Sequence, residues 1–180
     1  MMYNNERIQA TAPQFGFWNE GHSMTNFASP GSESKLILLI EDNIDDERLT
    51  LRALRKNNIM NEVVVACDGQ EAIDYLFAAG AFSGRDMSVM PAVVILDLKL
   101  PKLSGLEVLR RIRGESPTRR LPVVVLTSSE DERQIEESYA LGANSFITKP
   151  SDPTEFSEMI LQVAMYWLLL NRVAPEGALI

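Results

Sequence analysis

Five side chains suited to metal or phosphate chemistry follow directly after short apolar runs in this sequence. They are Glu41, Asp42, Asp97, Thr127 and Lys149. Each one alone carries little weight, because charged groups at strand ends are mostly solvated. Their appearance after four separate runs is more specific. If those runs are parallel strands, the side chains share one edge of a sheet and form one site.

The charges of this set indicate what the site would bind. Three carboxylates and one ammonium leave a net charge of −2. A divalent cation with oxygen ligands is the natural complement, and we expect Mg²⁺, which takes one or two carboxylates and leaves room for a phosphate oxygen. Asp97 could then attack phosphorus, while Lys149 and Thr127 stabilise charge on the transferring oxygens.

The apolar runs alternate with segments of helical period. The runs cover residues 36–40, 63–66, 92–96, 123–126 and 145–147. This alternation is typical of a parallel sheet with helices on both faces. The first, third and fourth runs are apolar throughout, as expected of strands buried on both faces. We therefore predict an α/β fold with a doubly wound, five-stranded parallel sheet.

Capping signals predict where the helices begin. A residue with a side-chain oxygen stands three positions before a glutamate at Asp68 and Glu71, Ser104 and Glu107, Ser129 and Glu132, and Asp152 and Glu155. Such pairs satisfy backbone donors that a helix start leaves free. Gly142 stands where the fourth helix should end. Each predicted helix thus follows a predicted strand.

Composition limits the function classes. Seventeen basic against 25 acidic residues give the 180-residue chain a net charge of −8, which disfavours direct contact with nucleic acid or an anionic membrane. No apolar run is long enough to span a bilayer. The one cysteine, Cys67, excludes an intramolecular disulfide. We expect a cytoplasmic protein without nucleic-acid or membrane binding.

Four motifs together resemble the receiver domains of bacterial two-component response regulators. They are Glu41-Asp42-Asn43, Asp97-Leu98-Lys99-Leu100-Pro101 with Gly105, Thr127-Ser128 and Lys149-Pro150. The resemblance covers residues 35–170. It implies a flavodoxin-like sheet of strand order 2-1-3-4-5. It also implies a signalling protein, not an enzyme, that takes a phosphoryl group from a sensor histidine kinase.

The resemblance assigns metal-binding roles to matching residues. Asp97 would be the phosphoacceptor, with Glu41 and Asp42 as the acidic pair beside Mg²⁺. The residue at Lys99 would offer its backbone carbonyl to the metal. Glu41 stands where aspartate is commoner in the family, so contact through a water molecule stays open.

The resemblance also implies a phosphate ligand and a switch. Lys149 would bind the phosphoryl group, and its bond to Pro150 would be the family's cis peptide. Thr127 would be the switch hydroxyl. Phe146, three residues before the lysine, would be the aromatic switch residue that turns inward, a role compatible with a place in the core.

The domain organisation follows from where these patterns begin and end. Residues 1–34 lack periodicity and end in Ser29-Pro30-Gly31-Ser32, so we predict a flexible N-terminal tail. Residues 35–172 form the predicted receiver domain, and residues 173–180 a C-terminal tail. Aromatic residues in the N-terminal tail leave open that it docks on a partner or on the domain. The signal is expected to leave through protein contacts.

The last predicted helix carries a second apolar stripe opposite its core-facing side. Its residues are Leu161, Met165, Leu168 and Leu169. Exposed apolar stripes usually mark interfaces, so we predict a homodimer through this helix. The alternative is that the N-terminal tail covers the stripe.

Two further features resemble single-domain receivers that serve bacterial phytochrome histidine kinases. One is the long connection at residues 78–90, and the other is the Trp167-Leu168 ending. The resemblance makes a bacteriophytochrome a candidate kinase.

The same residues bear on three other functions. A flavodoxin-like electron carrier would need a phosphate-binding turn after the first strand, where the acidic run from Glu41 to Asp46 repels phosphate. An aspartate-nucleophile hydrolase usually carries a second aspartate two residues after the first, where Lys99 stands. A receiver-fold binding module that acts without phosphorylation stays open as the alternative.

Overall fold

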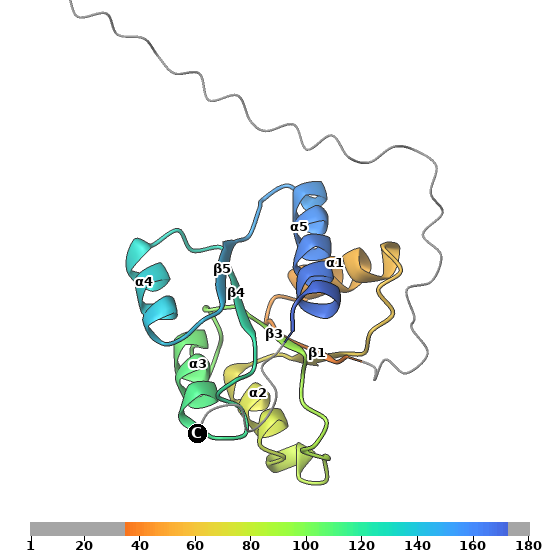
Figure 1. The fold of residues 1–180 in the computed structure, drawn as a ribbon. Helices are drawn as coiled ribbons and strands as arrows, with labels where there is room; N and C mark the ends of the chain where they lie inside the picture. The colour runs from red at the N-terminus through yellow and green to blue at the C-terminus, as the bar shows by residue number, and fades with distance from the viewer. Residues whose placement is uncertain (1–34, 173–180) are drawn as a thin grey trace, which may run out of the picture. The chain divides into compact units, whose positions relative to one another are not determined.

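The computed structural model describes residues 35–172, which form one parallel sheet with helices on both faces (Figure 1). Its strands are β1 (Ile37–Ile40), β2 (Val63–Ala66), β3 (Val93–Leu96), β4 (Val123–Thr127) and β5 (Ser145–Thr148). Their order, β2-β1-β3-β4-β5, confirms the predicted fold class. The predicted tails, residues 1–34 and 173–180, lie outside the described residues.

Helices cover the sheet in two layers. On one face α1 (Ile44–Lys56) packs against α5 (Pro153–Met165). On the other face lie α2 (Gly69–Leu76) and α3 (Gly105–Gly114), with α4 (Glu132–Ala140) beside α3 (Figure 1). None of the helices within residues 35–172 is long and apolar enough to cross a membrane.

Strand β1 shows how the sheet divides the core. Successive side chains of a strand point to opposite faces. Ile37 and Leu39 accordingly pack with α1 and α5, whereas Leu38 and Ile40 pack with α2 and α3. All four are buried, so an unbroken apolar run is what this position requires.

Three of the four predicted helix caps are confirmed. The side chains of Asp68, Ser104 and Asp152 accept backbone N–H groups of α2, α3 and α5. The predicted start of α4 was wrong, because Asp131 and not Ser129 caps that helix. Ser129 Oγ instead accepts the Asp131 N–H at 3.3 Å. Aspartate and serine are comparable caps, so sequence alone did not separate them.

The connection between α2 and β3 contains a 3₁₀ helix, Gly80–Phe82, and is anchored by aromatic contacts. The rings of Tyr75 and Phe82 meet edge to face at 5.3 Å, and the Arg85 guanidinium lies 4.2 Å from the Tyr75 ring centre. These contacts hold the long segment against α2, while Met87 and Val89 stay exposed.

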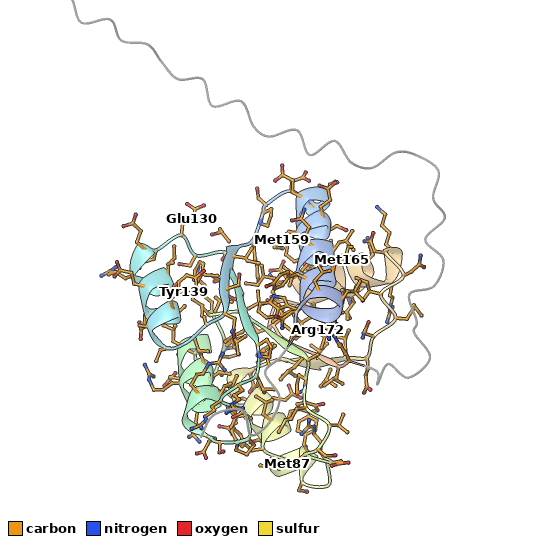
Figure 2. The ribbon with its side chains drawn as sticks, viewed as in Figure 1. Met87, Glu130, Tyr139, Met159, Met165 and Arg172 are labelled. Carbon is orange, nitrogen blue, oxygen red and sulfur yellow. The ribbon has the colours of Figure 1, made fainter. Side chains whose placement is uncertain are left out.

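The end of α5 corrects the predicted apolar stripe. The chain continues from Met165 as one wide π-helical turn, Tyr166–Leu170. Leu168, predicted to face outward, is 4 % exposed and lies in the core, whereas Leu169 is 59 % exposed as predicted. Leu161 and Met165 are half-buried, and Figure 2 shows Met165 on α5. The prediction assumed 3.6 residues per turn, and the wider turn shifts which residues face the sheet.

Candidate functional site

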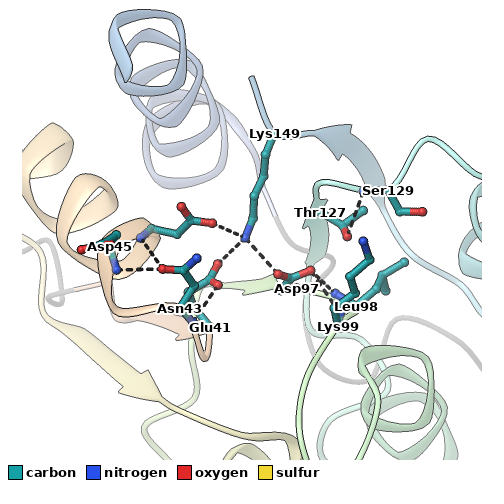
Figure 3. A network of polar contacts seen from close by, with 10 residues as sticks. Glu41, Asn43, Asp45, Asp97, Leu98, Lys99, Thr127, Ser129 and Lys149 are labelled. Carbon is teal, nitrogen blue, oxygen red and sulfur yellow. Dashed lines mark hydrogen bonds and ion pairs between the residues drawn. The ribbon is translucent and has the colours of Figure 1, made fainter. Parts of the chain in front are cut away.

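The carboxyl edge of the sheet brings the predicted residues together (Figure 3). Ile40 of β1 pairs with Leu96 of β3, so Glu41 and Asp97 emerge side by side. The Asp97 N–H donates to the Ile40 carbonyl at 3.0 Å, which fixes this register. Thr127 ends β4, and Lys149 follows β5.

The ammonium of Lys149 lies at the centre of the site. It donates to Glu41 Oε2 at 2.6 Å, to Asp46 Oδ2 at 2.8 Å and to Asp97 Oδ2 at 2.9 Å. The side chains of Lys149, Glu41 and Asp97 are each less than a tenth exposed. A buried ammonium requires partners for its three donors, and these carboxylates supply them.

Asp46 is the site residue that sequence reasoning missed as a contact. It belongs to the first turn of α1, 103 positions before Lys149. The signal was a fourth carboxylate within the acidic run that follows β1. The direction in which α1 follows β1 decides which carboxylate of that run contacts Lys149. Residue spacing within one strand does not determine that direction.

Burial and charge set the protonation of this network. Burial raises the pKa of Glu41 to about 7, although its hydrogen bond to Lys149 opposes the shift. Burial alone would lower the pKa of Lys149. Hydrogen bonds to Asp46, Glu41 and Asp97 outweigh that effect and raise it, so the lysine stays charged.

The Asp97 carboxylate is held in a fixed orientation. Oδ1 accepts the N–H groups of Leu98 at 2.6 Å and Lys99 at 3.2 Å, while Oδ2 accepts Lys149. Gly105 packs directly beneath, because a Cβ there would lie 2.2 Å from the Asp97 carbonyl oxygen. The backbone that orients the carboxylate therefore packs closely against the start of α3.

Glu41, Asp42 and Asp97 form a cluster that fits a divalent cation. One carboxylate oxygen from each lies within 4.8 Å of the others. Glu41 and Asp97 are buried, and Asp42 is exposed at the rim. An all-oxygen donor set with excess negative charge suits a hard cation such as Mg²⁺. Lys99 lies at the same edge (Figure 3), and the metal role of its carbonyl stays a prediction.

The predicted switch residues stand apart from this polar network. Thr127 is buried, and its Oγ1 accepts the Ser129 N–H at 3.4 Å. Phe146 is half-buried in β5, and its N–H donates to Tyr139 Oη at 3.2 Å. Figure 2 shows Tyr139 on α4 beside this strand. In the described residues neither switch side chain has a hydrogen bond to Asp97 or Lys149.

The predicted cis bond between Lys149 and Pro150 was wrong. Residues 35–172 contain no cis peptide bond. For a bond before proline the two isomers differ by about 0.5–1 kcal/mol, so the residue pair does not fix the isomer. The Lys149 N–H donates to the Thr127 carbonyl at 2.8 Å, which ties this segment to β4.

A doubly wound 2-1-3-4-5 sheet with an acidic cluster and a lysine at its carboxyl edge defines a receiver-type domain. The chain belongs to the response regulator receiver family, whose domain model, "Response regulator receiver domain", matches residues 37–161. Members of this family are signalling proteins that interact with histidine kinases and bind a divalent metal at an acidic pocket.

Three relatives illustrate the similarity. Response regulator Rcp1 of Synechocystis sp. is 36 % identical over 134 residues, which cover 74 % of this chain and 89 % of Rcp1. Its Mn²⁺-bound crystal structure has a TM-score of 0.72, at 33 % identity, and the match covers 78 % of this chain and 99 % of that one.

The other two are phytochrome response regulators by their descriptions. The phosphorylated cyanobacterial regulator RcpA has a TM-score of 0.74 at 36 % identity, and the match covers 79 % of this chain and all of RcpA. The bacteriophytochrome response regulator AtBRR is 49 % identical with a TM-score of 0.62, covering 78 % of this chain and 99 % of AtBRR. The chain is therefore a receiver of the Rcp1 type.

Proposed function

We propose that this chain accepts a phosphoryl group from a histidine kinase onto Asp97 in a Mg²⁺-dependent reaction. The observation that carries the proposal is the Asp97 carboxylate, fixed by two backbone N–H groups with the Lys149 ammonium 2.9 Å from Oδ2. A carboxylate oxygen of Asp97 attacks the phosphorus of a phosphohistidine. The new P–O bond replaces the P–N bond, and the leaving imidazole nitrogen keeps the electron pair.

The surrounding residues stabilise the transferring group. Lys149 supplies a positive charge, and the Thr127 hydroxyl can donate to a phosphoryl oxygen after a change of rotamer. Glu41, Asp42, Asp97 and the Lys99 carbonyl would hold Mg²⁺, which when bound supplies positive charge beside the transferring oxygens. Thr127 and Phe146 then report phosphorylation to β5 and the adjoining helices.

Labelling with a small phosphodonor tests the proposal. We expect the purified protein with acetyl phosphate and Mg²⁺ to gain one phosphoryl group by intact-mass spectrometry, and Asp97→Asn to gain none. The matched control is Asp45→Asn, an exposed aspartate of α1 close to the site. Unchanged labelling of Asp97→Asn would rule out this phosphoacceptor.

We further propose a bacteriophytochrome-type kinase as the partner and the cytoplasm as the location. The similarity to AtBRR and RcpA, both described as phytochrome response regulators, supports the kinase. The exposed free thiol of Cys67 suits a reducing compartment. The expected result is phosphotransfer from such a kinase that depends on Asp97.

A binding module that acts without phosphorylation is the second candidate. The observation that favours it is the closed network at Lys149, whose three donors are all satisfied by carboxylates. Such a network is stable without a phosphoryl group. If the wild-type protein takes no label from acetyl phosphate or from a kinase, this second function becomes the better account.

We also propose that the chain forms a homodimer through the end of α5. The exposed apolar side chains there are Tyr166, Leu169 and Leu170, which are 50, 59 and 70 % exposed. Contiguous apolar residues at a surface favour an interface. This surface replaces the predicted stripe, because Leu168 lies in the core.

A further inference from the structure

Asp46 differs from the other carboxylates of the site in where it comes from. Glu41 and Asp97 follow strands, whereas Asp46 belongs to the first turn of α1. Asn43 Oδ1 caps that turn by accepting the N–H groups of Asp45 at 2.9 Å and Asp46 at 3.4 Å. The cap fixes the backbone from which Asp46 reaches Lys149, and the Asp46 side chain is 26 % exposed.

The three partners of Lys149 have different roles in the proposed chemistry. Glu41 and Asp97 belong to the cluster that fits a cation, and Asp46 does not. Phosphorylation also converts Asp97 into an acyl phosphate, whose bridging carboxyl carries no charge of its own. Of the three carboxylates that accept from Lys149, Asp46 is therefore the one that neither binds the metal nor becomes phosphorylated.

We propose that Asp46 is a positioning residue, which holds the Lys149 ammonium at the site while Glu41 and Asp97 are engaged elsewhere. This inference rests on the proposed phosphorylation of Asp97. A lysine side chain is long and has many rotamers. A partner that stays in place therefore keeps the lysine ammonium at the position where the phosphoryl oxygens arrive. Asp46 acts through Lys149 and does not itself touch the phosphoryl group.

Asp46 also adds a negative charge, which by itself opposes the approach of an anionic donor. Positioning and repulsion therefore predict opposite effects when Asp46 is removed. Asp46→Asn deletes the charge but keeps an oxygen that can accept from Lys149, whereas Asp46→Ala deletes both. Asp45→Asn, one position earlier and exposed, makes the same charge change without touching Lys149.

The experiment measures the initial rate of phosphorylation of the full chain across acetyl phosphate concentrations, at saturating Mg²⁺. For Asp46→Ala we expect the maximal rate to fall roughly tenfold to a hundredfold, with little change in the half-saturating donor concentration. Asp46→Asn should recover most of that loss, and Asp45→Asn should match wild type. The affinity for Mg²⁺ without donor, measured by calorimetry, should stay close to wild type.

Three results would overturn the assignment. An unchanged maximal rate for Asp46→Ala would show that Lys149 needs no such partner. A faster Asp46→Ala would show that repulsion dominates. An Asp46→Asn as slow as Asp46→Ala would show that the charge, and not the contact, matters. In each of these cases wild type is labelled, so the proposed function survives; an unlabelled wild type would remove both.

Discussion

Glu41 is the residue whose ionisation couples the site to pH. Its pKa in the folded chain is about 7, against an ordinary value of 4.5. Between these pH values the folded, metal-free protein keeps a proton that the unfolded chain has released. Stability therefore falls as pH rises from about 4.5 to about 7, and above that the loss from Glu41 is complete.

Denaturant unfolding of the metal-free protein tests this dependence. We expect the free energy of unfolding of wild type to fall relative to that of Glu41→Gln as the pH rises from about 5 to about 8. The glutamine variant cannot ionise, so it lacks this part of the pH dependence. Parallel curves for the two proteins would contradict the raised pKa.

The same carboxyl should control metal affinity. A cation favours ionised Glu41, so below a pKa of about 7 binding must release its proton. We expect the half-saturating Mg²⁺ concentration of wild type to fall as pH rises toward 7 and to level off above it. Calorimetry should show weaker binding by Glu41→Gln, with less change over this pH range.

Gly105 shows how an element positions the site. A Cβ at this first residue of α3 would lie 2.2 Å from the Asp97 carbonyl oxygen, closer than atoms can approach. We expect Gly105→Ala to destabilise the protein by about 1–3 kcal/mol and to slow labelling of Asp97, because the backbone beneath the carboxylate must shift. Thermal unfolding and intact-mass spectrometry measure the two effects.

The matched control lies at the other end of the same helix. Nothing lies within 4 Å of a Cβ at Gly114, so Gly114→Ala should leave labelling unchanged and stability equal or higher by up to about 1 kcal/mol. Equal behaviour of the two variants would argue against close packing of α3 on the Asp97 backbone.

The wide turn after α5 determines which of two adjacent leucines contributes to stability. Leu168 is 4 % exposed and Leu169 is 59 % exposed. We expect Leu168→Ala to lower the free energy of unfolding by about 2–5 kcal/mol, and Leu169→Ala by less than about 0.5 kcal/mol. Urea unfolding of the two variants gives the comparison. A straight α-helix at 3.6 residues per turn would put both side chains on the outward stripe, so two small and similar losses would contradict the wide turn.

Sequence and structure agree where local chemistry decides the outcome. The unbroken apolar runs of β1, β3 and β4 predicted strands buried on both faces. The caps at Asp68, Ser104 and Asp152 predicted helix starts. The strand ends then placed Glu41, Asp97 and Lys149 at one edge. Each of these predictions needs only the residues of one element and a general rule of parallel sheets.

The predictions that were wrong concern alternatives of nearly equal energy, which the neighbouring residues in the sequence do not distinguish. Ser129 and Asp131 are similar caps, and the peptide bond before Pro150 has two isomers of similar energy. The wide turn at Tyr166–Leu170 leaves no mark in the apolar pattern, because several adjacent residues are apolar. The contact of Asp46 with Lys149 depends on the path of α1 relative to β5, which is a tertiary property.

The whole molecule has an apolar surface at the end of α5 that sets its predicted assembly. We expect wild type to sediment as a dimer and the double variant Leu169→Glu with Leu170→Glu as a monomer, because two charges would be buried in the interface. Met60→Glu is the control, since Met60 is 81 % exposed and lies between α1 and β2. A monomeric wild type, with and without phosphodonor, would exclude the dimer.

The contact between Tyr139 and Phe146 has a consequence for the open edge of the sheet. Strand β5 is at the border of the sheet, so its outer backbone groups could template a strand from another molecule. The outward N–H of Phe146, in the middle of that strand, donates a hydrogen bond to the Tyr139 hydroxyl. A tyrosine on α4 thus removes one of the free backbone donors with which a strand from another molecule could pair at this edge.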